Sequence, residues 1–305
     1  MTDDTNIKLW LKVRQMNFVE RASLAHRIRG YTMLTPQVVS IGHDSETGLI
    51  CKFSKVMGED TSQQQAFDSV KHLVNQTLLG SRASLICYGS TGSGKTHTLS
   101  GAEWKKEGII QKSVSEVHTV AKEKRLKGLK VSCFMVQIYK SDIVDLLRAD
   151  DAPIRALQLA YDVDGSVSIK NVHHQQAVRF LEDGGDRRLI DILNKGLDNR
   201  LMRSTVANEA SSRSHLLFGV TFTHTREDGS TVEGKMMFVD LAGSERLAML
   251  GYDLYLYEEA VFINESLTVL GRIIWRLSRG QQPHQIDYDH NILTSLLKDT
   301  LGGDA

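Results

Sequence analysis

The chain has 305 residues, enough for one large domain or two small ones, each with a buried core. Hydrophobic residues make up 41% and charged residues 24%, a composition typical of a globular protein rather than a disordered one. Lys plus Arg and Asp plus Glu are equal at 37 each, and no apolar run reaches membrane-spanning length. We therefore expect no nucleic-acid partner and no membrane insertion. Widely spaced cysteines and a polar N-terminus predict a cytoplasmic location.

Short apolar runs alternate with longer helical patterns, and this alternation predicts an α/β fold in one domain over residues 1–305. The expected strands are 9–13, 84–88, 129–139, 215–225 and 231–240. The expected helices are 63–79, 109–124, 180–196, 258–277 and 291–301. Because residues 226–230 contain Asp-Gly, the last two strands are predicted to form a hairpin.

The clearest motif follows the predicted strand 84–88. It reads Gly-x-x-x-x-Gly-Lys-Thr and comprises Gly89, Ser90, Thr91, Gly92, Ser93, Gly94, Lys95 and Thr96. Glycines in this pattern let backbone amides turn toward phosphates, the lysine adds positive charge, and the threonine hydroxyl can ligate Mg²⁺. The motif predicts a site for a nucleoside triphosphate with magnesium. It leaves kinases, GTPases, helicases, transporter ATPases and motors as alternatives.

Two further segments narrow these alternatives. Residues 208–215 place serine hydroxyls beside Arg213 directly before a strand, where they can reach a γ-phosphate, although a serine-rich turn is the alternative. Residues 238–246 end a strand at Asp240, a position from which a carboxylate holds magnesium through water. Gly243 then lets a backbone amide approach a phosphate.

The phosphate loop and these two segments, in this order and spacing, resemble the kinesin motor domain. The resemblance covers nearly the whole chain and is most specific in Ser-Ser-Arg-Ser-His (211–215) and Asp-Leu-Ala-Gly-Ser-Glu (240–245). It implies a central, mostly parallel twisted sheet with helices on both faces. It also implies ATP and Mg²⁺ as cofactors, ATP hydrolysis, microtubules as the partner and the cytoskeleton as the location. A GTPase is a weaker alternative, because the chain lacks an Asn-Lys-x-Asp segment for reading guanine.

The resemblance assigns roles to the two switch segments. In the first switch, Ser211 and Ser212 are expected to contact phosphate and magnesium. In the second, Asp240 and Gly243 are expected to sense the nucleotide. The metal ligands implied are Thr96, Ser212 and Asp240.

The resemblance also assigns a closing contact and an adenine pocket. Arg213 and Glu245 are expected to form an ion pair that closes the site around the attacking water, so that loop position follows the γ-phosphate. His97, Lys12 and Arg14 are expected to lie near adenine. A glutamine follows Arg14 where the family has proline, which predicts a looser adenine pocket.

The surface that faces the microtubule in this family departs from the family pattern. The basic segment Pro-Tyr-Arg-Asp-Ser-Lys-Leu-Thr-Arg is replaced by residues 287–295, with Asp289, Ile292 and Ser295 at its three basic positions. Between Leu247 and Ala305 the chain has four basic and eight acidic residues, the wrong sign for an acidic track. The composition predicts weakened microtubule binding.

Two hypotheses about this surface follow. The first is an ATPase that still engages microtubules, weakly or atypically, helped by arginines at helical spacing, which are Arg272, Arg276 and Arg279. The second is a nucleotide-dependent scaffold that binds another protein through apolar residues of the same region, or simply packs them into a core: Leu254, Leu256, Val261 and Phe262. The family continues into one further strand and a helix, so we expect an incomplete C-terminus and a gap beside the phosphate-loop strand.

Overall fold

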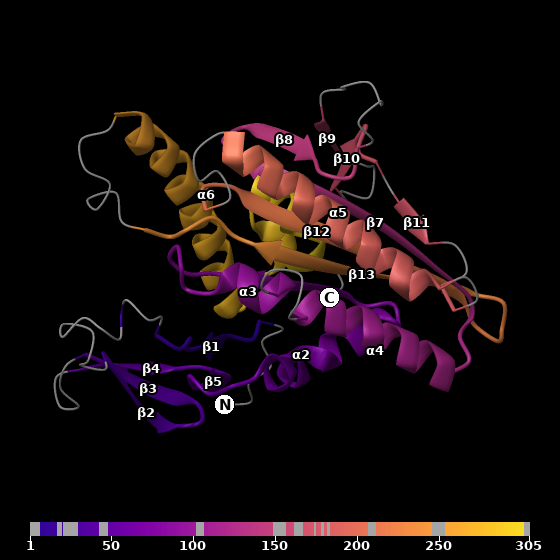
Figure 1. The fold of residues 1–305 in the computed structure, drawn as a ribbon, viewed down its shortest axis with the longest axis horizontal. Helices are drawn as coiled ribbons and strands as arrows, with labels where there is room; N and C mark the ends of the chain where they lie inside the picture. The colour runs from indigo at the N-terminus through magenta and orange to yellow at the C-terminus, as the bar shows by residue number, and fades with distance from the viewer. Residues whose placement is uncertain are drawn as a thin grey trace. The chain divides into compact units, whose positions relative to one another are not determined.

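The computed structural model describes residues 7–16, 20, 30–42, 48–101, 107–148, 157–161, 167–173, 175–177, 180–181, 184–206, 212–245 and 254–301 (Figure 1). The chain divides into two compact units, residues 1–66 and 67–305. Among the described helices, none has the length and apolar character needed to cross a membrane.

The first unit contains two small sheets. Strand β1 (Trp10–Lys12) pairs in parallel with β5 (Lys55–Met57). An antiparallel sheet is formed by β2 (Tyr31–Thr35), β3 (Val38–Ile41) and β4 (Leu49–Lys52). The sequence predicted only the first of these strands, because runs of three to five residues carry too little periodicity.

The second unit is built on a six-stranded sheet in the order β11-β7-β12-β13-β6, with β8 also paired to β7. Its strands are β6 (Arg82–Cys87), β7 (Lys127–Tyr139), β8 (Asp142–Asp145), β11 (Gln175–Ala177), β12 (His215–Thr225) and β13 (Thr231–Asp240). A separate antiparallel pair consists of β9 (Gln158–Tyr161) and β10 (Val167–Lys170).

The α/β class is confirmed, but the prediction of a mostly parallel sheet is wrong. In the described part of this sheet, β13 and β6 run parallel, and the other pairs run antiparallel. The predicted hairpin explains part of this difference, because β12 and β13 are joined by a five-residue turn and must therefore run in opposite directions. The sheet is mixed rather than mostly parallel.

The helices in the described part of the chain are α2 (Gln63–Thr77), α3 (Lys95–Ser100), α4 (Ile109–Glu123), α5 (Gly185–Val206), α6 (Leu254–Ser278) and α7 (Ile292–Leu301), with a short 3₁₀ turn η3 at Pro283–Gln285. Most bounds lie within a few residues of those predicted. The exception is α5, predicted at 180–196, which starts later because Gly184 has a φ of +63°, outside the helical region. It also continues ten residues further, to Val206.

Side chains alternate between two faces of the sheet, and helices cover both. On one face, Phe218, Val220 and Phe222 of β12 line a small cavity together with residues of α4 and α5. On the other face, Leu217 and Val239 belong to a buried cluster that includes residues of α6 and α7. Figure 1 shows α4 and α5 on the near side of the strands and α7 behind them. Helices therefore cover both faces of the sheet, as predicted, and α6 lies on the face opposite α4 and α5.

Candidate nucleotide site

The phosphate loop has the strand–loop–helix context that its motif requires. It leaves β6 at Cys87, and α3 begins at Lys95. Gly89, Gly92 and Gly94 have φ angles of +154°, +76° and +92°, values that side chains with a Cβ rarely adopt. A Cβ on Gly89 would also lie 2.7 Å from the Ser93 hydroxyl. The glycines of the motif are therefore needed for the path of this loop.

The Lys95 ammonium is held over the loop by two carbonyl groups. It donates to the Gly89 oxygen at 2.8 Å and to the Ser90 oxygen at 2.9 Å. Burial lowers the pKa of Lys95, while the carboxylates of Asp240 and Glu245 act in the opposite direction. The ammonium is thus a partly desolvated positive charge, and phosphate oxygens can replace the two carbonyls as its acceptors.

The predicted magnesium corner is assembled where α3 meets the end of β13. Thr96 donates its hydroxyl to Oδ2 of Asp240 at 2.6 Å, and Asp240 is only 1% exposed. The other carboxylate oxygen of Asp240, Oδ1, is buried and has no hydrogen-bond partner among the described residues. The Thr96 hydroxyl and the unpartnered Oδ1 of the Asp240 carboxylate suit Mg²⁺, because this ion prefers oxygen ligands and retains water. Ser212 is described, but its predicted contact with the metal stays a prediction.

A buried arginine, missed by the sequence prediction, shares the same carboxylate. Arg200 of α5 donates from Nη1 to Oδ2 of Asp240 at 2.8 Å and from Nη2 to the Ser214 oxygen at 3.2 Å. The two side chains of this ion pair are 5% and 2% exposed. Arg200 therefore fixes the Asp240 carboxylate and the first-switch backbone relative to α5.

The two switch segments are hydrogen-bonded to each other and to the phosphate loop. The Gly243 amide donates to the Ser212 oxygen at 2.8 Å, and the Ser244 amide donates to the Gly89 oxygen at 3.2 Å. The Thr91 amide donates to Oε1 of Glu245 at 3.1 Å. A Cβ at position 243 would lie 2.1 Å from Oε2 of Glu245 and 2.4 Å from the Thr91 hydroxyl, so a larger residue would displace these side chains. The three motifs form one connected site.

The predicted ion pair between Arg213 and Glu245 is not present in this structure, and its formation when nucleotide is bound stays a prediction. Arg213 pairs instead with Glu259 of α6 at 3.0 Å, and the Tyr139 hydroxyl donates to the other oxygen of the same carboxylate. Glu259 is 4% exposed, so its charge needs these partners, whereas Glu245 is turned toward the phosphate loop. The first switch is therefore joined to α6 in this structure.

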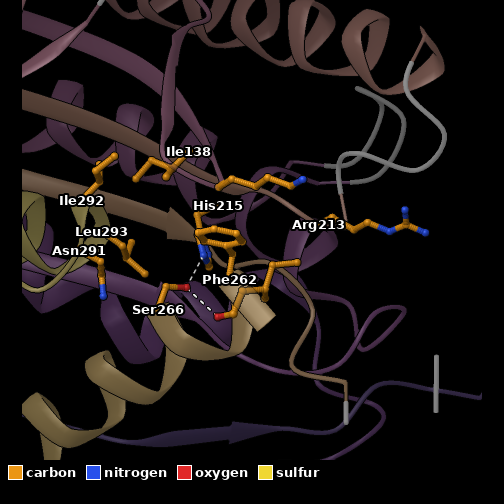
Figure 2. A pocket seen from close by; sticks show the side chains of 10 residues that line it. Ile138, Arg213, His215, Phe262, Ser266, Asn291, Ile292 and Leu293 are labelled. Atoms are coloured by element: carbon orange, nitrogen blue, oxygen red, sulfur yellow. Dashed lines mark hydrogen bonds between the residues drawn. The ribbon is translucent and has the colours of Figure 1, made fainter. Parts of the chain in front are cut away.

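His215, the last residue of the first-switch motif, is buried and makes two contacts, of which Figure 2 shows the one with Ser266. Its Nδ1 accepts from the Ala242 amide at 3.1 Å, and its Nε2 lies 2.9 Å from the Ser266 hydroxyl of α6. Burial lowers the pKa of His215 to about 4, and the positive charge of Arg200 acts in the same direction. The ring is neutral at pH 7.

The remaining predicted site residues are distributed as follows. Ser211 lies outside the described residues. Lys12 and Arg14 belong to the unit 1–66, where Arg14 pairs with Glu20, and this hydrogen bond raises the pKa of Arg14. His97 lies on α3 in the other unit and is exposed. The grouping of these three side chains around adenine stays a prediction.

Helical periodicity contains a signal for the residues that the sequence prediction missed. Leu189, Leu193 and Leu197 of α5 are all buried at a spacing of four residues, and Arg200, three residues further, continues the same helix face. Similarly, Glu259 precedes buried positions of α6 at helical spacing, of which Leu267 and Leu270 are examples. A charged residue in phase with an apolar stripe predicts a buried ionic contact.

The surface that the sequence marked as altered is less acidic than its composition suggests. Glu259 is buried against Arg213, and Asp299 lies 3.8 Å from both Arg82 and Lys235. Ser295, taken as a surface position, is 1% exposed, and its hydroxyl donates back to the Asn291 oxygen. Among the side chains described from residue 257 onward, the charges outside these pairs are Glu265, Asp287 and Asp289 against Arg272, Arg276, Arg279 and Lys298, and Glu258 lies outside the described side chains.

The fold and site together define a phosphate-loop nucleotide-binding protein with two switch segments. The family model described as "Kinesin motor domain" matches residues 13–305, and the chain therefore belongs to the kinesin motor domain family. Members of this family are ATPases.

Individual relatives agree with this assignment. Kinesin-like protein KIN-14I of Oryza sativa subsp. japonica is 35% identical over 255 residues, which cover 83% of this chain and 20% of that protein. The kinesin heavy chain of Drosophila melanogaster is 31% identical over 99% of this chain and 30% of its own length. A solved structure titled as that of a fast kinesin superposes with a TM-score of 0.82 at 27% identity, covering 98% of this chain and 83% of that chain. The chain thus spans less than a third of the length of these two curated relatives.

Proposed function

We propose that this chain binds Mg-ATP, hydrolyses it, and couples the nucleotide state to the binding of microtubules. The observation that carries the proposal is the continuous set of contacts from the phosphate loop through both switches to α6. Ser244 bonds to Gly89, Gly243 bonds to Ser212, and Arg213 pairs with Glu259 of α6. A change at the nucleotide is therefore transmitted to a helix on the outer surface.

The residues of the site have distinct tasks in this proposal. Lys95 and the loop amides bind and orient the phosphates, and Thr96, Ser212 and Asp240 hold Mg²⁺, which neutralises charge on the transferred phosphoryl group. Backbone amides of the second switch bind the γ-phosphate, and Glu245 positions the attacking water. The protein supplies positioning and charge rather than a covalent intermediate.

The Glu245 task requires a change of partners from the structure described above. Its carboxylate accepts from the Thr91 amide, and Arg213 contacts Glu259. When phosphate takes the Thr91 amide, Glu245 is released, and Arg213 can exchange Glu259 for Glu245. The ion pair between Arg213 and Glu245 then forms in the triphosphate state. The pair between Arg213 and Glu259 belongs to a state in which the two switches are not closed over the nucleotide.

A turnover assay with and without microtubules tests the proposal. We expect Mg-dependent ATP hydrolysis that microtubules accelerate, together with co-sedimentation at low salt in the presence of a non-hydrolysable ATP analogue. Lys95→Ala removes the only ammonium held over the phosphate loop in the described residues, so it should abolish both nucleotide binding and turnover. Lys298→Ala, on α7, is the matched control and should leave both intact. Protein that stays wholly in the supernatant would refute microtubule coupling.

An exposed apolar region on α6 supports a second candidate, a nucleotide-dependent scaffold for another protein. Tyr257, Val261 and Phe262 are 48%, 40% and 48% exposed, beside Glu265. Large exposed apolar side chains grouped on one helix are typical of protein-binding surfaces. Strong acceleration of turnover by microtubules would exclude this candidate, and nucleotide binding without any acceleration would favour it.

A further inference from the structure

His215 connects the second switch directly to the middle of α6. The ring accepts the Ala242 amide at Nδ1 and contacts the Ser266 hydroxyl at Nε2, at 3.1 and 2.9 Å. Figure 2 shows Ser266 between His215 and the backbone of α6. The Ser266 hydroxyl in turn donates to the Ile263 oxygen at 2.7 Å. A single side chain of β12 therefore bonds to two segments that are distant in sequence.

The hydrogen-bond roles of this bridge follow from the donors available. A backbone amide can only donate, so Nδ1 of His215 is an acceptor and carries no proton. The proton of the neutral ring is then on Nε2, which donates to the Ser266 hydroxyl. Because Ser266 gives its own proton to Ile263, every donor in the chain from Ala242 to α6 points in the same direction. Each contact depends on the position of the one before it.

Two side chains of the first-switch motif reach α6 from different elements. Arg213 lies in the turn that precedes β12, and His215 is the first residue of β12. Glu259 and Ser266 are seven residues apart, which is two turns of one helix face. The Arg213 link begins at the first switch. The His215 link begins at Ala242, next to the Gly243 amide, which donates to the Ser212 oxygen.

We propose that His215 is a positioning residue that couples the second switch to α6 by transmitting displacement of the Ala242 backbone to Ser266. This inference rests on the proposed function, because Gly243 moves when its amide exchanges the Ser212 oxygen for phosphate. The ring is 4% exposed and packed between the two segments, so it cannot swing aside to keep one bond while losing the other. An ordinary core histidine would need only one of these contacts.

The test measures α6 in two nucleotide states. Amide hydrogen exchange over residues 262–270 is compared in Mg-ADP and in Mg with a non-hydrolysable ATP analogue. In Ser266→Ala, we expect the difference between the two states to fall by about threefold to tenfold, the factor that corresponds to one intramolecular hydrogen bond. The affinity for the analogue, measured by titration, should stay within about twofold of the unmodified chain, since one such bond outside the phosphate site is lost.

Three further variants separate coupling from a general structural effect. Ser113→Ala removes a buried hydroxyl that, like that of Ser266, donates to its own helix, and it should leave the difference unchanged. Ser266→Thr keeps the hydroxyl and should restore the difference. His215→Gln keeps a polar group but cannot contact both segments, so it should reduce the difference as Ser266→Ala does.

The outcomes are distinguishable from those that test the proposed function. If the unmodified chain fails to bind Mg-ATP in the titration, the proposed function and this coupling are both overturned. If it binds and hydrolyses ATP but Ser266→Ala retains the full difference in α6, only the coupling through His215 is overturned. A loss in Ser266→Ala that Ser266→Thr restores supports the coupling.

Discussion

The inner and outer faces of α6 differ in the contacts that their side chains make. On the inner face, Glu259 and Ser266 each bond to a specific side chain of the first-switch motif. On the outer face, Tyr257 and Trp275 are 48% and 60% exposed, and an ordinary contact there is the Arg279 guanidinium, 5.6 Å from the centre of the Trp275 ring. The departures from the family pattern at Asp289, Ile292 and Ser295 lie in the segment after α6. In the proposed function, the inner side of α6 serves the nucleotide site and its outer side serves the partner.

The largest expected effect is on stability, and it comes from breaking the buried ion pair between Arg200 and Asp240. Arg200→Ala leaves the Asp240 carboxylate buried without its charged partner, so the free energy of unfolding should fall by about 3–5 kcal/mol. Urea denaturation measures this change. Arg187→Ala, an exposed position on the same helix, is the control and should change stability by less than about 0.5 kcal/mol. Equal effects of the two variants would contradict a structural role for the Arg200 pair.

The second effect is a loss of ATP hydrolysis with nucleotide binding retained. In Glu245→Ala, the affinity for a fluorescent ATP analogue should be retained, while turnover falls by about 100-fold because the attacking water is no longer positioned. Glu265→Ala, which removes an exposed carboxylate on the outer side of α6, should leave turnover unchanged. Normal turnover in the Glu245 variant would refute its assignment to the second switch.

The third effect is a dependence of stability on pH. The pKa of His215 is about 4 in the folded chain and 6.5 as its ordinary value, so the unfolded state binds more protons between these values. Stability from this group is therefore fully present above about pH 6.5 and is lost as the pH falls toward 4. Between pH 7 and pH 5 the loss is about 2 kcal/mol.

His215→Gln provides the comparison for this pH effect. Other titrating groups contribute equally to both proteins, so the difference between their melting temperatures should change with pH by the His215 contribution alone. If the difference in melting temperature between the two proteins is the same at pH 7 and pH 5, His215 is not buried as a neutral ring.

The smallest expected effect is on the outer face. Arg276→Ala should weaken microtubule co-sedimentation at low salt by about twofold to fivefold, because exposed charges contribute modestly. Added salt should reduce the difference between the variant and the unmodified chain. Arg187→Ala on α5 serves again as the control. If Arg276→Ala binds as tightly as the unmodified chain at low salt, the arginines form an ordinary exposed helix face rather than part of the partner surface.

The sequence predicted the elements that carry strong local signals. The long strands β7, β12 and β13 and the helices α2, α4, α6 and α7 follow from periodicity, and the phosphate loop follows from its glycines. The short strands of residues 1–66 gave no such signal. Strand direction in the sheet was inferred from the family rather than from the turn between β12 and β13, whose length already required an antiparallel pair.

The contacts that link the site to α6 were harder to predict from the sequence. Arg213 and Glu259 are 46 residues apart, and His215 and Ser266 are 51 residues apart. Sequence patterns report neighbours along one element, and such pairs depend on how a strand and a helix pack together. The contact of Glu245 is equally remote in sequence, since its carboxylate meets an amide 154 residues earlier in the chain.

The hairpin of β12 and β13 also constrains how this chain can change in evolution. Both switches are attached to its open end, where Leu216 lies opposite Asp240, and the turn at residues 226–230 forms its far end. Inserting one residue within either strand would shift the register and turn Asp240 away from Thr96. Additional residues in the turn would leave that register intact. Length variation among descendants of this sequence should therefore accumulate at the turn and be purged from the strands.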